Sequence, residues 1–101
     1  LGQVFSNLFA NALFEMKQGG SLSVTLECDD FEALVTISDT GDGIPEEHMN
    51  KIFDPFFTTK ERGTGFGLSV VLRIVKTYSG RIHVESEPGQ GTTFQVWLPL
   101  A

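Results

Sequence analysis

The order in which helical and strand-like hydrophobic patterns follow one another limits the fold of this chain more than any other feature. Residues 1–17 carry apolar side chains at every third or fourth position, which is the period of one helix face. Residues 22–26 and 31–37 then alternate apolar and polar side chains, as strands with one buried face do. A short polar turn at Asp29-Asp30 separates these two segments, so we expect an antiparallel hairpin.

The second half of the chain repeats this succession. After a loop rich in turn residues at 39–45 and a short helix expected near 46–51, a second amphipathic helix is predicted over 68–78. Two further alternating segments, around 82–84 and 94–98, flank a Pro88-Gly89 turn. Paired strands beside separate helices predict an α+β fold: a two-layer α/β sandwich whose mixed, mostly antiparallel sheet packs against helices on one face.

Length and composition fit one globular domain. The 101 residues suffice for one domain, and a hydrophobic content of 41% with nine Phe predicts a packed core rather than disorder. The first helical pattern starts without a capping residue. We therefore expect residues 1–101 to be a single domain that lacks the N-terminal edge of its fold.

The charge balance limits the ligands. A formal net charge of −6 disfavours nucleic acid as a partner, because an acidic surface repels its phosphates. A phosphate-bearing ligand would need positive charge from a few basic residues, a metal ion or backbone N–H groups. The single cysteine, Cys28, and the lack of a signal peptide or membrane-length apolar run favour a cytoplasmic domain with no direct membrane contact.

A glycine-rich segment, KERGTGFGLS at residues 60–69, directly precedes the second predicted helix. Its glycines lie at every second position, which excludes the dinucleotide fingerprint, and the chain contains no P-loop motif. Because the N-terminus of a helix offers unpaired N–H donors to anions, the segment is suited to phosphate binding. The alternative is a plain flexible connector.

Two groups of polar residues lie where a ligand would meet the helix and sheet. Asn7 and Asn11 are four residues apart and share one side of the first helix. Their amide oxygens are hard ligands suited to Mg²⁺, unless they simply decorate a solvated face. Asp39 ends a strand and is placed to accept a hydrogen bond from an amino group in a pocket, or to cap its own turn. Gly41 and Gly43 serve that turn or let a flat ligand approach the backbone.

Four motifs in order give these residues a common context. They are NLFANA at residues 7–12, DTGDGI at 39–44, FDPFF at 53–57 and GTGFGL at 63–68. They resemble the N, first glycine, F and second glycine boxes of the histidine kinase catalytic domain, from the superfamily that includes DNA gyrase, the ninety-kilodalton heat-shock chaperone and MutL. GQGTTF at 89–94 is similar to the C-terminal strand entry of that domain. The resemblance covers essentially the whole chain and implies a Bergerat-type ATP-binding fold.

The resemblance implies ATP and Mg²⁺ as cofactors. Asn11 would coordinate Mg²⁺, Asn7 would lie near the phosphates, and Asp39 would receive the adenine amino group. Thr93, or alternatively Thr92, would support that carboxylate. A short lid over 58–64 would contribute Lys60 and Arg62, the only basic residues of the lid. The residues implied to act in catalysis are Asn7, Asn11 and Lys60, and those implied to contact ATP are Asn11, Asp39, Gly41, Gly43, Ile44, Phe57, Thr58, Lys60, Arg62, Gly63, Thr64, Gly65, Phe66, Gly67, Leu68, Thr92 and Thr93.

The implied activity is transfer of the γ-phosphoryl group of ATP to a histidine of a two-component sensor kinase. ATPases of the superfamily carry a glutamate that activates water at the position of Asn7, and an amide cannot act as a general base. His48 and His83 lack the sequence context of the family's phosphorylated histidine. The implied partners are therefore the dimerisation and histidine-phosphotransfer domain of the same protein and a response regulator receiver domain. A protein-serine kinase and a nucleotide-binding module without catalysis are the alternatives. The chain departs from the family pattern at two positions. Phe14 stands where many members carry a basic or polar residue, and Phe66 stands where leucine is usual.

Overall fold

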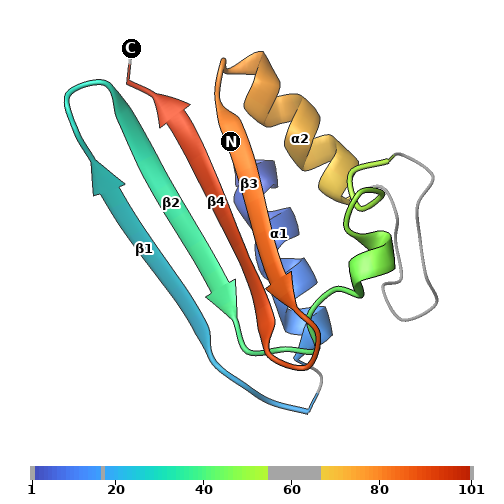
Figure 1. The fold of residues 1–101 in the computed structure, drawn as a ribbon. Coiled ribbons are helices and arrows are strands. Elements are labelled where there is room, and N and C mark those ends of the chain that lie inside the picture. Colours follow the sequence, from blue (N-terminus) through green and yellow to red (C-terminus); the bar gives the residue numbers. More distant parts are fainter. Residues whose placement is uncertain (1, 17, 55–66, 101) are drawn as a thin grey trace.

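The computed structural model describes residues 2–16, 18–54 and 67–100. Helices and strands follow the predicted order, and Figure 1 shows both α-helices on the same side of the sheet. Their bounds are α1 Gly2–Glu15, β1 Leu22–Cys28, β2 Glu32–Asp39, the 3₁₀ helix η1 Glu46–His48, α2 Gly67–Thr77, β3 Arg81–Glu87 and β4 Gly91–Pro99. The helix expected near 46–51 is thus a single 3₁₀ turn, which starts directly after Pro45.

The four described strands form one sheet in the order β1-β2-β4-β3, and each neighbouring pair is antiparallel. Together with the two helices on one face, this confirms the predicted α+β sandwich. The central pair, β2 and β4, is in register from Glu32↔Pro99 to Asp39↔Thr92. Because directly opposed residues share a face of the sheet, this register places Asp39 and Thr92 side by side on the face that the helices cover.

The core lies between this face and the two helices. Each helix contributes a buried stripe at three- and four-residue spacing, and the central strands contribute every second residue, as the sequence pattern predicted. Ile44 and Ile52, from the segment that joins β2 to α2, complete the core. The buried apolar residues are Val4, Leu8, Ala12, Ile37, Ile44, Ile52, Leu68, Val71, Val75, Phe94 and Val96.

Strand β1 differs from its prediction. Its alternating pattern predicted one buried face, but every residue from Leu22 to Cys28 is exposed, and Leu26 is 68% accessible. The apolar side chains do lie on the helix side of the sheet, since Val24 pairs with Ile37 of the core. Figure 1 shows β1 at the edge of the sheet, beyond the reach of both helices. The alternation correctly predicted which way the side chains point, but whether anything covers them depends on where the helices pack.

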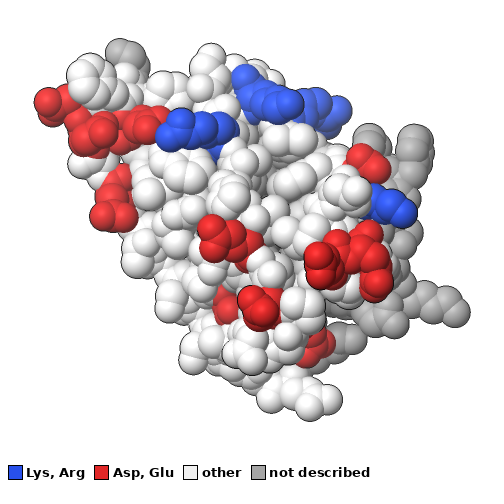
Figure 2. Space-filling model, in the orientation of Figure 1, with Lys and Arg blue, Asp and Glu red and all other residues white. Residues whose placement is uncertain are grey.

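Charge is distributed unevenly over the described surface. Helix α2 carries Arg73 and Lys76 and no acidic residue. Figure 2 shows basic side chains grouped over α2 and the start of β3, while acidic side chains are spread over the rest of this face. None of the described helices is both long and apolar enough to cross a membrane.

Candidate functional site

A buried carboxylate lies at one end of the sheet. Asp39 is the last residue of β2 and only 5% exposed. Its Oδ1 accepts hydrogen bonds from the backbone N–H groups of Gly41, at 2.9 Å, and Thr92, at 3.3 Å. Both of these hydrogen bonds go to Oδ1, and the residue itself lines a cavity at this end of the sheet. The carboxylate is therefore held through one oxygen and offers the other to a ligand.

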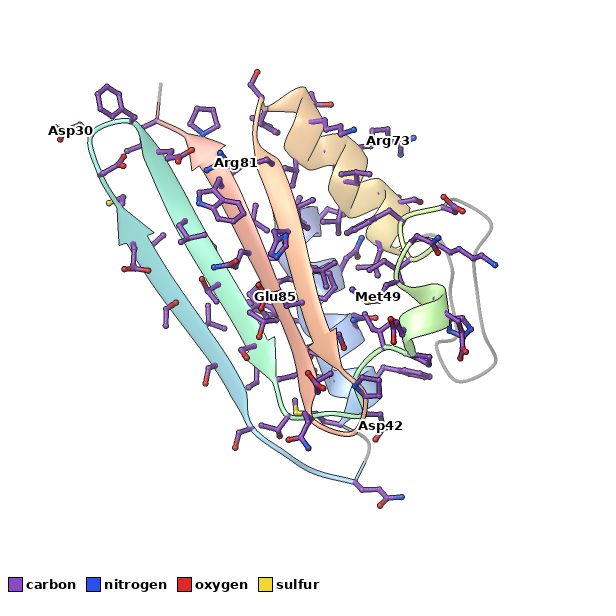
Figure 3. All side chains as sticks on the ribbon, viewed as in Figure 1. Asp30, Asp42, Met49, Arg73, Arg81 and Glu85 are labelled. Atoms are coloured by element: carbon purple, nitrogen blue, oxygen red, sulfur yellow. The ribbon has the colours of Figure 1, made fainter. Side chains whose placement is uncertain are left out.

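The space beside Asp39 is a cavity of about 660 Å³ at the junction of β2, β3 and β4. This volume is within the range of small-molecule sites. Met49, which follows η1, borders it from the segment between β2 and α2, as Figure 3 shows, and Glu85 and Glu87 border it from β3. The complete lining consists of Ser38, Asp39, Thr40, Met49, Glu85, Ser86, Glu87, Gln90, Gly91, Thr92 and Thr93.

The two threonines of GTTF lie on opposite faces of β4. Thr92 faces the helices beside Asp39 and is 2% exposed. Thr93 points to the other face, where its Oγ1 lies 2.8 Å from the Oγ of Ser38. The sequence left open which threonine accompanies the carboxylate, and the alternation of the strand places Thr92 there.

The DTGDGI segment is packed closely against the turn between β3 and β4. The N–H of Gly89 donates to the carbonyl of Asp42 at 2.7 Å. Gly43 has a φ of 74°, and a Cβ there would collide with the carbonyl oxygen of Glu87. Gly91 has a φ of 135°, and a Cβ there would collide with the carbonyl oxygen of Asp39. Only glycine fits both the backbone conformation and the space at these two positions.

The two asparagines of the N box lie on α1. Asn7 and Asn11 are half-buried, one helical turn apart and beside the buried stripe of Val4, Leu8 and Ala12. They do not line the cavity beside Asp39, so any shared ligand must extend from the sheet end to this helix. Among residues 2–16, 18–54 and 67–100, no three His, Cys, Asp or Glu side chains gather as a metal site.

The second glycine motif is described only from its last glycine onward. Gly67 opens α2, and Leu68 is buried in the core directly after it. The remaining candidate residues of the F box, the lid and the second glycine box lie outside the described residues; they are Phe57, Thr58, Lys60, Arg62, Gly63, Thr64, Gly65 and Phe66.

A second cavity, of about 630 Å³, runs along the outer side of α2. Phe53, Val70 and Leu72 line it together with the basic Arg73 and Lys76. None of its lining residues is a buried polar group. The cavity at Asp39 is the better candidate site, because a buried, hydrogen-bonded carboxylate in a concave pocket provides directional recognition.

Five residues that line the cavity at Asp39 lie outside the sequence motifs, namely Ser38, Met49, Glu85, Ser86 and Glu87. Ser86 carried a signal that sequence reasoning should have used. Ser86 is the next inward-facing residue of β3 after Ile82 and Val84. The alternating pattern predicts an apolar side chain at this position, but the residue is polar. Met49 lies in a turn segment, where no periodic pattern identifies a lining residue.

All 101 residues match the family model described as histidine kinase-, DNA gyrase B- and HSP90-like ATPase. The chain belongs to this family. Sporulation kinase A of Bacillus subtilis (strain 168) is 46% identical over 99 residues, which cover 98% of this chain and 16% of that kinase. Sensor histidine kinase ZraS of Escherichia coli (strain K12) is 43% identical over 100 residues, covering 99% of this chain and 22% of that protein. This chain, as a member of the histidine kinase-like ATPase (HATPase) family, thus spans less than a quarter of the length of these two relatives.

Solved structures agree with the family assignment. The catalytic domain of histidine kinase ThkA superimposes with a TM-score of 0.84 at 38% identity, covering 96% of this chain and 65% of that chain. A mycobacterial sensor histidine kinase, MprB, gives the same TM-score of 0.84 at 29% identity, covering 97% and 70% of the respective chains. Within the HATPase family, this chain therefore has the fold of a histidine kinase catalytic domain.

Proposed function

We propose that this domain binds Mg-ATP and transfers the γ-phosphoryl group to a histidine on the dimerisation domain of a parent two-component sensor kinase. The observation that carries the proposal is the buried Asp39 carboxylate, which accepts two backbone hydrogen bonds through Oδ1 and lines a ligand-sized cavity. Sequence similarity to sporulation kinase A and ZraS supports the kinase assignment.

In the proposed complex, Oδ2 of Asp39 accepts a hydrogen bond from the amino group of adenine. Guanine presents a carbonyl at the same position of the ring and would meet the carboxylate acceptor to acceptor, so the site selects adenine. Gly43 lies alongside the base, because the lack of a side chain there lets a flat ring approach the backbone. Thr92, rather than Thr93, is the threonine of this base site, since it shares the face of Asp39.

Charge fixes the orientation of the nucleotide. Asp39, Glu85 and Glu87 all line the cavity, and the triphosphate would be repelled by this acidic rim. The base therefore occupies the cavity, and the phosphates extend away from it toward the N-terminal end of α2, where the first backbone N–H groups of the helix are available to anions. We assign the lid residues Lys60, Arg62 and Gly63, together with Gly65 and Gly67, to the phosphates.

A magnesium ion fits the residue types on α1. The amide oxygen of Asn11 is a hard, neutral donor of the kind that Mg²⁺ accepts, and Mg²⁺ commonly completes its shell with phosphate oxygens and water. Bound there, the ion would neutralise negative charge on the phosphates. Asn7, one turn earlier on the same side of α1, is assigned to the neighbourhood of the phosphates.

The proposed reaction is phosphoryl transfer, not hydrolysis. A histidine nitrogen of the partner domain attacks the γ-phosphorus, the bond from that phosphorus to the bridging oxygen breaks, and ADP leaves. Catalysis of this kind is mainly positioning and charge neutralisation. Asn7 stands where a water-activating glutamate would be needed, and an amide does not remove a proton from water. A response regulator receiver domain would then accept the phosphoryl group, in the cytoplasm, where ATP is available.

Titration calorimetry with a non-hydrolysable ATP analogue tests the first half of the proposal. We expect binding that requires Mg²⁺, and absence of binding with Mg²⁺ present would refute the proposal. For the second half, the domain is mixed with the helical-hairpin domain of its parent kinase and labelled ATP. Acid-labile label on a histidine is expected. Acid-stable label on serine would favour a protein-serine kinase, and binding without transfer would favour a non-catalytic module.

A further inference from the structure

We propose that Ser86 is the positioning residue of the base site, where it fastens the DTGDGI loop to strand β4 and so determines selectivity for adenine. This inference rests on the proposed function. Ser86 is the last inward-facing residue of β3, a half-buried hydroxyl at a position that continues the apolar row of Ile82 and Val84. It lines the cavity at Asp39 without belonging to any of the recognised motifs.

Three hydrogen-bond partners surround the Ser86 hydroxyl. The backbone N–H of Ile44 donates to Oγ at 2.7 Å, the carbonyl of Gly91 lies 3.1 Å from it, and Oγ1 of Thr92 lies 3.0 Å away. A hydroxyl has one proton and two lone pairs. With its proton donated to the Gly91 carbonyl, its lone pairs accept from Ile44 and Thr92, so the three contacts use its full capacity.

These partners lie on the two segments that build the base site. Ile44 ends the DTGDGI loop, while Gly91 and Thr92 begin β4. Thr92 is also the residue whose backbone N–H holds Oδ1 of Asp39 at 3.3 Å. Ser86 thus joins the far end of the loop to Thr92, one of the two residues whose N–H groups hold the carboxylate at its near end.

The glycines of the site leave little room for this junction to shift. Gly43 lies directly on the backbone of Glu87, and Gly91 lies directly on that of Asp39. Figure 3 shows Asp42, the loop residue directly before Gly43, at the same end of the sheet as the C-terminal ends of β2 and β3. If the hydroxyl of Ser86 is removed, the Ile44 N–H loses its acceptor at a half-buried position. Because the segments are packed this tightly, a shift of the loop toward another partner would displace Gly43 and Asp39 with it.

Removal of the Ser86 hydroxyl should reduce selectivity for adenine, because Gly43 and Asp39, the residues it displaces, are those proposed to recognise the adenine ring. Ser86→Ala should weaken binding of a Mg-bound ATP analogue about tenfold, the size of one lost hydrogen bond. Binding of the matching inosine analogue, which lacks the amino group that Asp39 recognises, should change less than about twofold. Ser86→Thr, which keeps the hydroxyl and favours a strand, should retain the adenine-to-inosine ratio of the natural chain.

The matched control is Thr36→Ala. Thr36 also carries a half-buried hydroxyl in the sheet, on β2, but it does not line the cavity at Asp39. It should leave both affinities unchanged. If Ser86→Ala does not fold, as judged by its thermal transition, Ser86→Cys replaces it, because the thiol keeps the shape but is a weak hydrogen-bonding group.

These measurements distinguish a failure of the proposed role of Ser86 from a failure of the proposed ATP-binding function. If the natural chain does not bind the adenine analogue, the proposed function fails. If the natural chain binds and Ser86→Ala weakens both nucleotides equally, Ser86 has only a structural role and the inference fails. It also fails if the Ser86→Ala ratio equals that of the natural chain, or if Ser86→Thr loses selectivity as strongly as Ser86→Ala.

Discussion

The sharpest test of the base site is Asp39→Asn, which changes one atom facing the ligand and leaves the shape of the side chain intact. In the natural chain, Oδ1 accepts the N–H groups of Gly41 and Thr92 at 2.9 and 3.3 Å. The carbonyl oxygen of asparagine can take over both bonds. The amide NH₂ group then occupies the position of Oδ2 and faces the cavity.

The reverse orientation of the asparagine amide is disfavoured, because its NH₂ group would face the two N–H donors. The variant should therefore fold, with a change in the free energy of unfolding below about 1 kcal/mol and a shift in Tm of a few degrees at most. The adenine amino group, however, would now meet a donor instead of a charged acceptor.

The expected loss of affinity follows from the hydrogen bond removed. A hydrogen bond to a charged group contributes about 1.5–3 kcal/mol, so the Kd of a Mg-bound ATP analogue should rise by roughly 10- to 150-fold. The inosine analogue should bind the variant better than it binds the natural chain, since its ring carbonyl accepts from the new NH₂ group. A change of preference in this direction cannot arise from general destabilisation.

Calorimetric titration with both analogues measures these changes, and Asp42→Asn is the control. Asp42 lies in the same loop and loses the same charge, but its side chain is exposed. It should bind both analogues as the natural chain does. A folded Asp39→Asn variant with adenine affinity within twofold of the natural chain would contradict the reasoning, and Asp39 would then only cap its own turn.

Three further predictions concern the effect of Mg²⁺ on binding, the stability of the sheet end that holds Gly91, and the pH dependence of stability. Asn11→Ala should reduce the gain in ATP-analogue affinity on adding Mg²⁺ by about tenfold while leaving binding without Mg²⁺ unchanged, measured by titration with and without a chelator. Gly91→Ala should lower the free energy of unfolding by at least about 1–3 kcal/mol in urea denaturation, because its φ of 135° is strained for alanine and its Cβ would collide with backbone. Backbone N–H groups of Glu32 and then Phe31 lower the pKa of Asp29, so its stabilising contribution is present above the ordinary pKa of 3.8 and is lost as the pH falls through the lowered value. Asp29→Ala should thus be less stable than the natural chain at pH 7 and nearly equal to it in strong acid.

Each of these variants has a matched control in the described part of the chain. Asn50→Ala removes an exposed amide and should not alter the effect of Mg²⁺. Gly89→Ala has a similarly unfavourable φ of 82° but open space around its Cβ, so it should cost less than Gly91→Ala. Asp30→Ala, next to Asp29 and exposed, should not reproduce the acid dependence. Equal effects in variant and control would contradict the corresponding prediction.

The fold was predictable because its core follows two simple periods. Leu8 of α1 and Val71 of α2 belong to apolar rows at helical spacing. Ile37 and Phe94 lie on strands whose side chains alternate between apolar and polar, so the sequence indicated which faces of the helices and the sheet meet. The exposure of Leu26 on β1 was not predictable, because alternation reports the direction of a side chain and not whether a helix reaches it.

The candidate site was predictable in its motifs and less so in its geometry. The motifs pointed to Asp39, but Thr92 and Thr93 are adjacent and chemically equal, and only the register with β2 shows which of them shares the face of Asp39. Ser86 was missed because it belongs to no motif and acts through contacts with residues far away in the chain, such as Ile44, 42 positions earlier.

The exposed strand β1 has a consequence for how this domain behaves in solution. Its outer edge has no strand partner among the described residues and leaves a row of backbone donors and acceptors that another extended chain can pair with. None of its residues lines the cavity at Asp39, so a strand added there would extend the sheet without touching the base site. A ligand with equal affinity for the single and the extended sheet shifts neither population. Association through β1 and nucleotide binding are therefore expected to be two independent equilibria, the first set by protein concentration and the second by nucleotide alone.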